Sequence, residues 1–262
     1  MINNTYLMNK VLLLFSLLFS TSIFAQTIVN AEQLNSSNDS LTFSLQMTYE
    51  GTRGNAVTDE FDLAPSVSLV KKKNNFKLFG GYSVLSEESN TLLNSGFAHI
   101  RHNYKISNRL KTFEFYQIQF NEVLLLTKRE LFGAGLRYSI VAEDSVSFDL
   151  GIGFMQENEF LNNETLMPGE TTDTYFIRGA TVSSFQWIIN ETVQINNVFY
   201  YQPNMIDLSD YRILNDFMLT TQVSDEIYFI ASFTARYDSK PPSSLQGFDS
   251  KFNVGVGYTF SK

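Results

Sequence analysis

Two histidines, His99 and His102, are the side chains of this sequence best suited to acid–base or metal chemistry. They lie in a segment, residues 92–105, whose alternating pattern predicts a β-strand. Residues three positions apart on a strand point to opposite faces, so the two imidazoles cannot bind one metal ion. The chain has no cysteine, which excludes thiolate metal sites and a cysteine nucleophile. We therefore expect no catalytic residue, no metal site and no cofactor.

Charged side chains recur on one face of the alternating segments, opposite the face that carries aromatic and aliphatic residues. Charges removed from bulk water must be paired or hydrated. The favoured interpretation is a network of arginine–carboxylate pairs that fills and stiffens a narrow interior. The alternative is a selective pore, because rings of charged side chains can select ions or solutes. The predicted network comprises Glu50, Asp62, Lys77, His99, Arg101, Arg137, Asp149, Arg178, Arg212, Asp216, Arg236, Asp238 and Lys251.

Three glycine pairs resemble fragments of a nucleotide-binding loop: Gly133–Gly135, Gly151–Gly153 and Gly255–Gly257. Each pair lies on one face of a predicted strand with no helix after it, which argues against a phosphate-binding loop. We expect these glycines to relieve crowding on the inner face and to let the strands bend.

The composition favours a membrane barrel. Aromatic residues make up 15% of the chain, with 24 Phe and 13 Tyr against a single Trp. Transmembrane barrels combine low average hydropathy with aromatic residues at the two membrane interfaces. The net charge of -8 argues against nucleic acid as a partner, since proteins that bind it need a basic face.

The N-terminus predicts export. A weakly basic start at Asn9–Lys10 precedes the mostly apolar run Val11–Phe24, and Ala25–Gln26 resembles a signal-peptidase junction. We predict a signal peptide over residues 1–25 and a polar periplasmic leader over 26–39, with an N-terminal anchor helix as the alternative. No later stretch has the roughly 18 consecutive apolar residues of a transmembrane helix. A membrane location then requires a closed barrel.

The alternation predicts an all-β, antiparallel, up-and-down transmembrane barrel of about twelve strands over residues 40–262. It is clearest at the end of the chain, over Phe248–Phe260. Short and long connections alternate, as in even-stranded outer-membrane barrels with periplasmic termini. We expect an irregular link over Leu124–Arg129, the longest loop over Glu157–Thr171 and a bulge at Pro65. The alternative is a soluble sandwich or barrel with its apolar face in a core.

Several segments together resemble one known family of outer-membrane barrels, domain of unknown function 481, in the form common among Bacteroidota. The segments are Asn94–Tyr104, Leu131–Tyr138, Asp210–Arg212, Arg236–Pro242 and Val254–Phe260. The junction Ala25–Gln26, followed by Thr27–Asn30, is also similar to members of this family. The resemblance implies a secreted outer-membrane barrel. It implies no substrate and no catalytic residues.

The leading functional hypothesis is a non-enzymatic protein of the cell outer membrane, in the form of a narrow channel with a charged lumen. The first alternative is a structural or envelope-stress barrel that conducts nothing. The second is a lipid-modifying enzyme, which needs a serine beside a histidine at the outer rim, whereas His102 falls near the periplasmic end. The expected partners are outer-membrane lipid, the barrel assembly machinery and a small solute or ion. The sequence leaves the solute and the oligomeric state open.

Overall fold

The computed structural model describes residues 41–52, 58–87, 90–164 and 166–261. The predicted signal peptide and leader lie outside these residues. No helix in the described part of the chain is long and apolar enough to cross a membrane.

The described residues form twelve strands and one short 3₁₀ helix, η2 (Glu122–Leu124). The strands are β1 (Leu41–Thr52), β2 (Thr58–Lys71), β3 (Asn74–Glu87), β4 (Asn90–Lys105), β5 (Leu110–Asn121), β6 (Leu126–Ala142), β7 (Val146–Leu161), β8 (Asp173–Ile188), β9 (Val193–Pro203), β10 (Tyr211–Gln222), β11 (Ile227–Asp238) and β12 (Phe248–Ser261).

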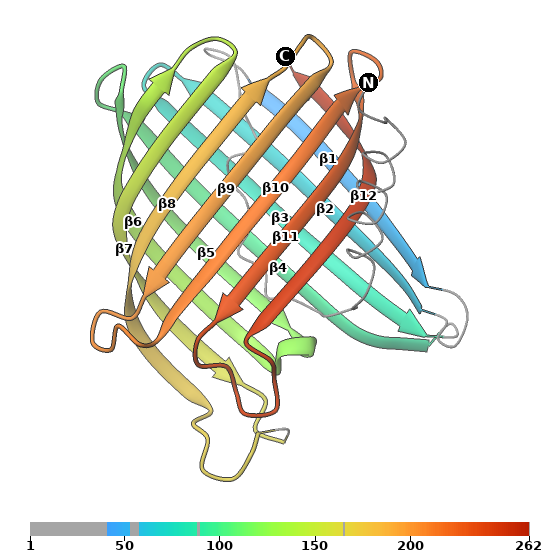
Figure 1. The fold of residues 1–262 in the computed structure, drawn as a ribbon, viewed down its shortest axis with the longest axis vertical. Helices are drawn as coiled ribbons and strands as arrows, with labels where there is room; N and C mark the ends of the chain where they lie inside the picture. The colour runs from blue at the N-terminus through green and yellow to red at the C-terminus, as the bar shows by residue number, and fades with distance from the viewer. Residues whose placement is uncertain (1–40, 53–57, 88–89, 165, 262) are drawn as a thin grey trace, which may run out of the picture.

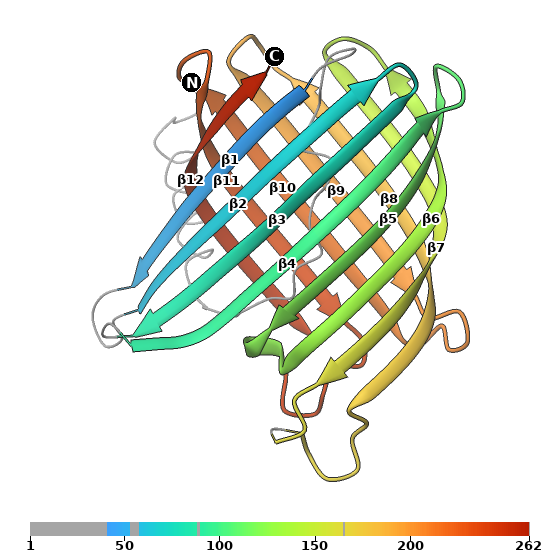
Figure 2. The same cartoon turned by 180° about the vertical axis from the view of Figure 1, so that it is seen from behind.

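Each strand pairs antiparallel with its sequence neighbours, and β1 pairs with β12 to close the barrel. In the closing pair, Met47 lies opposite Val256 and Leu45 opposite Tyr258. The start of β1 and the end of β12 lie at the same rim as the short turns, at the top of Figures 1 and 2, and the longer connections lie at the other rim. The predicted barrel fold is confirmed. The predicted alternation of short and long connections holds only in part, because the β3–β4 and β5–β6 connections are as short as the turns at the other rim.

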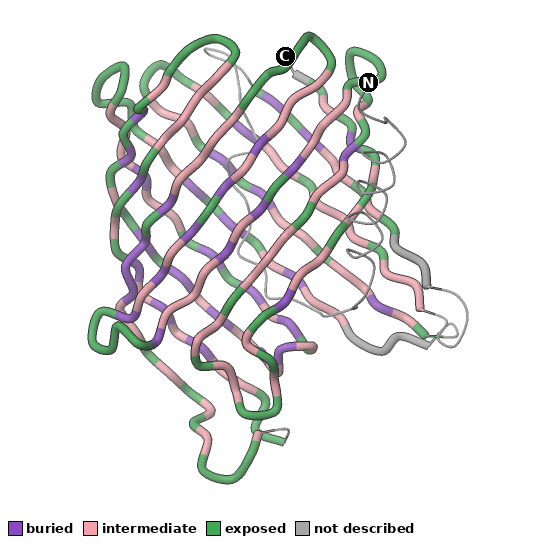
Figure 3. The backbone as a smooth tube through the Cα atoms, in the orientation of Figure 1, coloured by how far each residue is buried: buried purple, intermediate pink, exposed green. Residues whose placement is uncertain are grey.

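Burial alternates along the strands because one face points into the lumen and the other outward (Figure 3). On β7, Ile152 and Phe154 are 67% and 61% exposed on the outer face, while Gly151 and Met155 point inward. A Cβ atom added at Gly153 would lie only 2.2 Å from the carbonyl oxygen of Ala134 on β6. The glycine allows this close approach of two strands.

Three local predictions are wrong. The link expected over Leu124–Arg129 is instead η2 followed by the start of β6, and β7 continues to Leu161, so Glu157 is a strand residue. The cause is that these strands run on beyond the apolar outer belt, where their outward residues are polar and resemble a loop. Pro65 makes no bulge: it stays in register with Leu45, and the pairing with β3 skips Pro65 without a change of register.

Candidate functional site

A cluster of ion pairs lies in the lumen near the long-connection rim, with Glu157 at its centre. The Glu157 carboxylate accepts hydrogen bonds from Arg178 Nε at 2.9 Å and from Arg212 Nη1 at 2.6 Å. Arg129 Nε lies 3.8 Å from the same carboxylate. Only 1% of the Glu157 side chain is exposed. A carboxylate buried this deeply must be paired, and three arginines surround it.

Glu159 and Asp238 extend this pairing. Glu159 accepts hydrogen bonds from Arg129 Nε at 2.7 Å and from Arg212 Nη2 at 3.1 Å. Asp238 accepts a hydrogen bond from Arg212 Nε at 2.8 Å. Arg212 therefore donates to three carboxylates, from β7 and β11. Arginine suits this position because its planar fork presents several fixed donors.

Asp210 connects the cluster to the β9–β10 connection. It accepts hydrogen bonds from Arg178 Nη1 at 3.0 Å and Nη2 at 3.2 Å, which is a bidentate pair. Asn204 Nδ2 donates to the same carboxylate at 3.0 Å, and the Arg178 guanidinium lies 5.2 Å from the centre of the Phe176 ring. The lumen ion cluster, as we name it, comprises Arg129, Glu157, Glu159, Arg178, Asp210, Arg212 and Asp238.

The cluster extends across part of the lumen and does not only pair neighbouring strands. Arg212 on β10 reaches Glu157 on β7, although two strands separate β7 from β10 in the wall. Arg178 is only 1% exposed. Three arginines against four carboxylates leave the cluster one formal negative charge. Every arginine in it contacts at least one carboxylate at hydrogen-bonding distance, which offsets the cost of removing these charges from water.

A second group of charges lies on the β12–β1–β2 wall. Lys251 Nζ lies 2.6 Å from Glu60 and 3.1 Å from Asp62. Thr48 Oγ1 donates to Asp62 at 2.7 Å, and Ser83 Oγ donates to Glu60 at 2.9 Å. The lysine side chain is 23% exposed, so this group is less deeply buried than the lumen ion cluster.

Arg236 on β11 forms a third group with two aspartates. It lies directly opposite Asp249 in the β11–β12 register. Asp216 on β10 lies opposite Thr234, one diagonal step from Arg236. Both carboxylates interact electrostatically with the arginine. Neighbours of this kind on one face of a sheet attract each other when their charges are opposite.

Toward the short-turn rim the lumen wall of β3–β6 is mainly basic. Lys77 lies opposite Arg101 in the β3–β4 register, and Lys111 lies opposite Arg137 in the β5–β6 register. Lys77, Arg101 and Arg137 are buried. Asp149 on β7 lies 3.7 Å from Lys111 Nζ. The lumen near the short-turn rim is therefore mainly basic on this wall. The three groups of charges near the long-connection rim are mixed in sign and net acidic.

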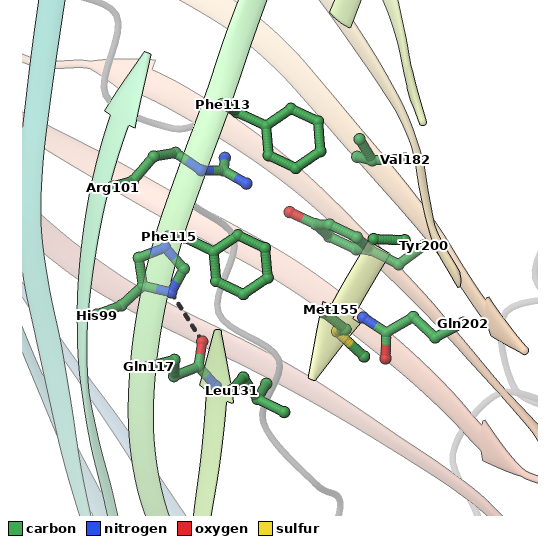
Figure 4. A pocket seen from close by; sticks show the side chains of 11 residues that line it. His99, Arg101, Phe113, Phe115, Gln117, Leu131, Met155, Val182, Tyr200 and Gln202 are labelled. Carbon is green, nitrogen blue, oxygen red and sulfur yellow. Dashed lines mark hydrogen bonds between the residues drawn. The ribbon is translucent and has the colours of Figure 1, made fainter. Parts of the chain in front are cut away.

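A cavity of ≈ 30 Å³ lies beside this basic wall. Arg101 points into it from β4 and Tyr200 from β9, as Figure 4 shows. The Arg101 guanidinium lies 5.6 Å from the centre of the Phe113 ring, and His99 Nδ1 lies 2.8 Å from Gln117 Oε1. The cavity joins a cation to aromatic surface, an arrangement that favours cation–π contact.

A second cavity of ≈ 30 Å³ lies next to the first, toward the long-connection rim. Leu131 and Gln202 line both cavities and therefore lie where the two meet. The second cavity is also lined by Glu157 and Arg212 of the lumen ion cluster and by residues 241 and 245–247 of the β11–β12 connection. A cavity of this size holds about two water molecules.

Carboxylates also fix the connections at the long-connection rim. Asp207, between β9 and β10, lies 2.6 Å from Lys240 Nζ, between β11 and β12. Hydrogen bonds from Lys240 and Ser209 lower the pKa of Asp207 to about 2. Ser239 Oγ donates to the carbonyl oxygen of Ser209 at 3.0 Å. These contacts hold the β9–β10 and β11–β12 connections together at this rim.

Glu170 links the β7–β8 and β11–β12 connections, and its pH response is predictable. It accepts hydrogen bonds from the backbone N–H of Ser243 at 2.6 Å and of Met167 at 2.9 Å, which lower its pKa below 4.5. Because the pKa is lower in the folded state, the link is complete at neutral pH and is lost as the pH falls through the folded pKa. In NMR spectra, the Ser243 and Met167 amide protons should shift with one midpoint below pH 4.5.

The matched variant is Glu170→Gln, which should remove that transition from both amide signals. Separate midpoints for the two amides, or a common transition that persists in the variant, would contradict the link.

The structure places the sequence-predicted charged residues on the inner face but divides them among separate groups. Arg178, Arg212 and Asp238 meet in the lumen ion cluster. Asp62 pairs with Lys251, Asp216 lies near Arg236, and Lys77, His99, Arg101, Arg137 and Asp149 lie on the wall nearer the short turns. Glu50 lies in β1, and its side chain lies outside the described residues.

The sequence prediction omitted the centre of the cluster. Glu157, Glu159 and Arg129 were assigned to loops, and Asp210 follows a loop. A signal for three of them exists. Glu157 and Glu159 continue the odd-numbered inward series of Asp149 and Gly151 along β7, and Arg129 continues the odd-numbered inward series of Gly133 and Arg137 along β6. Asp210 has no such signal, because it lies outside a strand.

Comparison with known families gives a match over most of the chain. The model of the family described as "Protein of unknown function, DUF481" matches residues 35–260. The chain belongs to this family. The family resemblance of the sequence is thus confirmed, and the chain is an outer-membrane type barrel of the DUF481 family. None of the curated proteins is similar to the chain in sequence.

Two solved structures illustrate how the DUF481 barrel resembles other barrels. The NanC porin superposes with a TM-score of 0.51 at 10% sequence identity, over 83% of this chain and 98% of that one. The COG4313 outer membrane channel from Pseudomonas putida F1 superposes with a TM-score of 0.51 at 6% identity, over 90% of this chain and 100% of the other. At such identities the likeness concerns the fold alone.

Proposed function

We propose that this DUF481 barrel is a non-enzymatic channel of the outer membrane, narrow enough to be closed by its own side chains. The observation that carries the proposal is the lumen wall. It buries arginines, lysine, carboxylates and glutamines, including Arg101, Arg178, Gln117 and Glu157, around two cavities in series. A barrel with a purely mechanical role would be at least as stable with apolar side chains inside, because buried ion pairs seldom stabilise a protein more than a packed apolar core does.

In the proposed channel, two places restrict passage. Leu131 and Gln202 line both cavities where they meet, and Glu157 and Arg212 of the lumen ion cluster line the second cavity. Cavities of this size admit water and not a larger solute. Passage therefore requires a movement of side chains or of the β11–β12 connection, which lines the second cavity.

The two superposing structures support this proposal, since one is a porin and the other an outer membrane channel. The same proposal includes secretion with cleavage at Ala25–Gln26 and insertion by the barrel assembly machinery. The inserted barrel is surrounded by outer-membrane lipid, and it passes a small solute or ion. The apolar outer face, with Ile152 and Phe154 more than half exposed, fits contact with lipid chains.

The second candidate function is a barrel that conducts nothing, with the charges as a structural plug. The observation that favours it is the mutual pairing in the lumen ion cluster, where Arg212 alone contacts three carboxylates. A lipid-modifying enzyme is supported less: His102 Nδ1 lies 2.9 Å from Glu114 and Nε2 lies 2.9 Å from Asn74, so both ring nitrogens contact groups that are not hydroxyls.

Single-channel recording tests the proposal. The chain from Gln26 onward is refolded and inserted into a planar bilayer. Small, steady or flickering conductance steps with a charge preference are expected from a narrow, charged lumen. A folded and inserted barrel that stays silent at all voltages would overturn the channel and favour the plug.

A substitution between the two cavities should change that current. Leu131→Ala removes the apolar side chain that lies where the two cavities meet, so we expect larger unit conductance than in the unchanged barrel. Leu136→Ala is the matched control, since Leu136 lies on the same strand but is 47% exposed on the outer face. Equal conductance of the two variants would show that the path does not pass Leu131.

A further inference from the structure

The short-turn rim is divided into a basic and an acidic half. The basic sector, formed by the β2–β3 and β4–β5 turns and their flanks, comprises Lys71, Lys72, Lys73, Lys105 and Arg109. The acidic sector, formed by the β6–β7, β8–β9 and β10–β11 turns, comprises Glu143, Asp144, Glu191, Asp225 and Glu226. All ten residues are exposed, and each sector has charges of one sign among its described residues.

The basic sector is held as a unit by the backbone. The N–H of Lys105 donates to the carbonyl oxygen of Lys73 at 2.8 Å, which joins the two basic turns. Lys105 also lies opposite Lys111 in the β4–β5 register. Like charges placed side by side repel each other. In a chain with a net charge of -8, this concentration of cations is a local feature that attracts anions.

The outer face below the basic sector carries a hydrogen-bonded polar row. His102 on β4 contacts Glu114 on β5 and Asn74 on β3, and the ring of Phe76 stacks on His102 with the ring centres 4.6 Å apart. The His102 and Glu114 side chains are 32% and 43% exposed. Charged groups on the outer face of a barrel are costly at mid-membrane and nearly free at the interface. The row therefore belongs at the depth of lipid head groups.

Exposed apolar residues flank both sectors: Leu69, Tyr104 and Ile106 lie beside the basic turns, and Ile189, Val223 and Ile227 lie beside the acidic turns. The polar row lies on β3–β5, next to the basic turns. The cations of the basic sector therefore adjoin both apolar outer surface and this polar row.

We propose that the basic sector binds the phosphate groups of anionic phospholipids in the leaflet around the short-turn rim. The proposal rests on the membrane placement under the proposed function but not on conduction. Cations at the edge of an apolar belt lie at the depth of the lipid phosphates, whose surface density in a leaflet is high. Each such cation strengthens the binding of anionic lipid about fivefold. A second copy of the barrel, bound through its acidic sector, is the main competing partner.

Spin-labelled lipids in vesicles test the proposal. The barrel is refolded into phosphatidylcholine vesicles with a minor fraction of phosphatidylglycerol, and electron paramagnetic resonance measures how strongly each labelled lipid is immobilised by protein. We expect phosphatidylglycerol to be enriched over phosphatidylcholine at low salt. The variant K71Q/K73Q/R109Q should lose this enrichment, by up to about fivefold for each cation removed.

The matched control is E143Q/D144N/E191Q, which changes the same number of charges in the acidic sector and should keep the enrichment. No enrichment in the unchanged barrel, or equal loss in both variants, would overturn the proposal. A salt-sensitive dimer abolished by either variant, without enrichment, would identify a second copy as the partner and also overturn it. A silent barrel that still enriches phosphatidylglycerol would overturn conduction alone, and a barrel that fails to insert would overturn the membrane placement itself.

Discussion

Replacement of Glu157 by glutamine should lower the free energy of unfolding of the barrel by about 1–3 kcal/mol, because two buried charge-assisted hydrogen bonds are weakened while both arginines keep other carboxylates. Glu157 contacts Arg178 at 2.9 Å and Arg212 at 2.6 Å, and its side chain is 1% exposed. The amide keeps the shape but loses the charge. The two guanidinium groups then stay buried with one carboxylate fewer. Arg178 keeps Asp210 and Arg212 keeps Asp238, so the barrel should fold but unfold at lower denaturant concentration.

The measurement is urea unfolding of the barrel in lipid vesicles, with folded and unfolded forms separated by their electrophoretic mobility. Glu164→Gln is the control, because Glu164 is exposed in the β7–β8 connection and surface changes stay within about 0.5 kcal/mol. If Glu157→Gln unfolds at the same urea concentration as Glu164→Gln, the cluster does not stabilise the barrel. An accompanying rise in conductance would show that the same contacts close the channel.

Much of the fold could be predicted from the sequence because the signal repeats. Every strand of a barrel has one face to lipid and one to the lumen, so the period of two recurs along the whole chain. Phe252, Val254 and Val256 on β12 point outward as this period requires, and Gly255 and Gly257 point inward. The order of the strands follows once their number is fixed by the turns, because each strand pairs with its neighbours in sequence.

The lumen ion cluster could be predicted only in part, because parity gives the face of a side chain but not its partner. Parity assigns Arg178 and Arg212 to the inner face, but it does not identify their shared contact, Glu157. That residue lies on β7, and two strands separate it from Arg212 on β10. Such contacts depend on barrel width and shear, which no local pattern contains. The ends of β6 and β7 were predicted wrongly for a related reason. Beyond the lipid belt the outer face of a strand is polar, so the alternation of apolar and polar residues that indicates a strand disappears.

Introduction of an arginine at Val256 should prevent stable assembly of the barrel in a membrane. Val256 is 43% exposed on the outer face of the closing strand, opposite Met47 on β1 and Phe229 on β11, which are also exposed. An arginine on the lipid face of a barrel costs about 2–4 kcal/mol near the middle of the membrane. The loss falls on the strand that closes the barrel, so we expect little folded Val256→Arg protein in vesicles, measured as the fraction with folded electrophoretic mobility.

Thr259→Arg is the control on the same strand, because Thr259 faces the lumen near the short-turn rim. Thr259 Oγ1 donates to Ser44 Oγ at 3.4 Å, and Ser44 also lies 2.9 Å from the Tyr228 hydroxyl, so an arginine there enters a polar wall near its opening. We expect this variant to fold at close to the normal yield. Equal yields of folded protein for the two variants would mean that the outer face does not contact lipid. A low yield for Val256→Arg alone requires apolar surroundings outside the barrel and a polar lumen inside it.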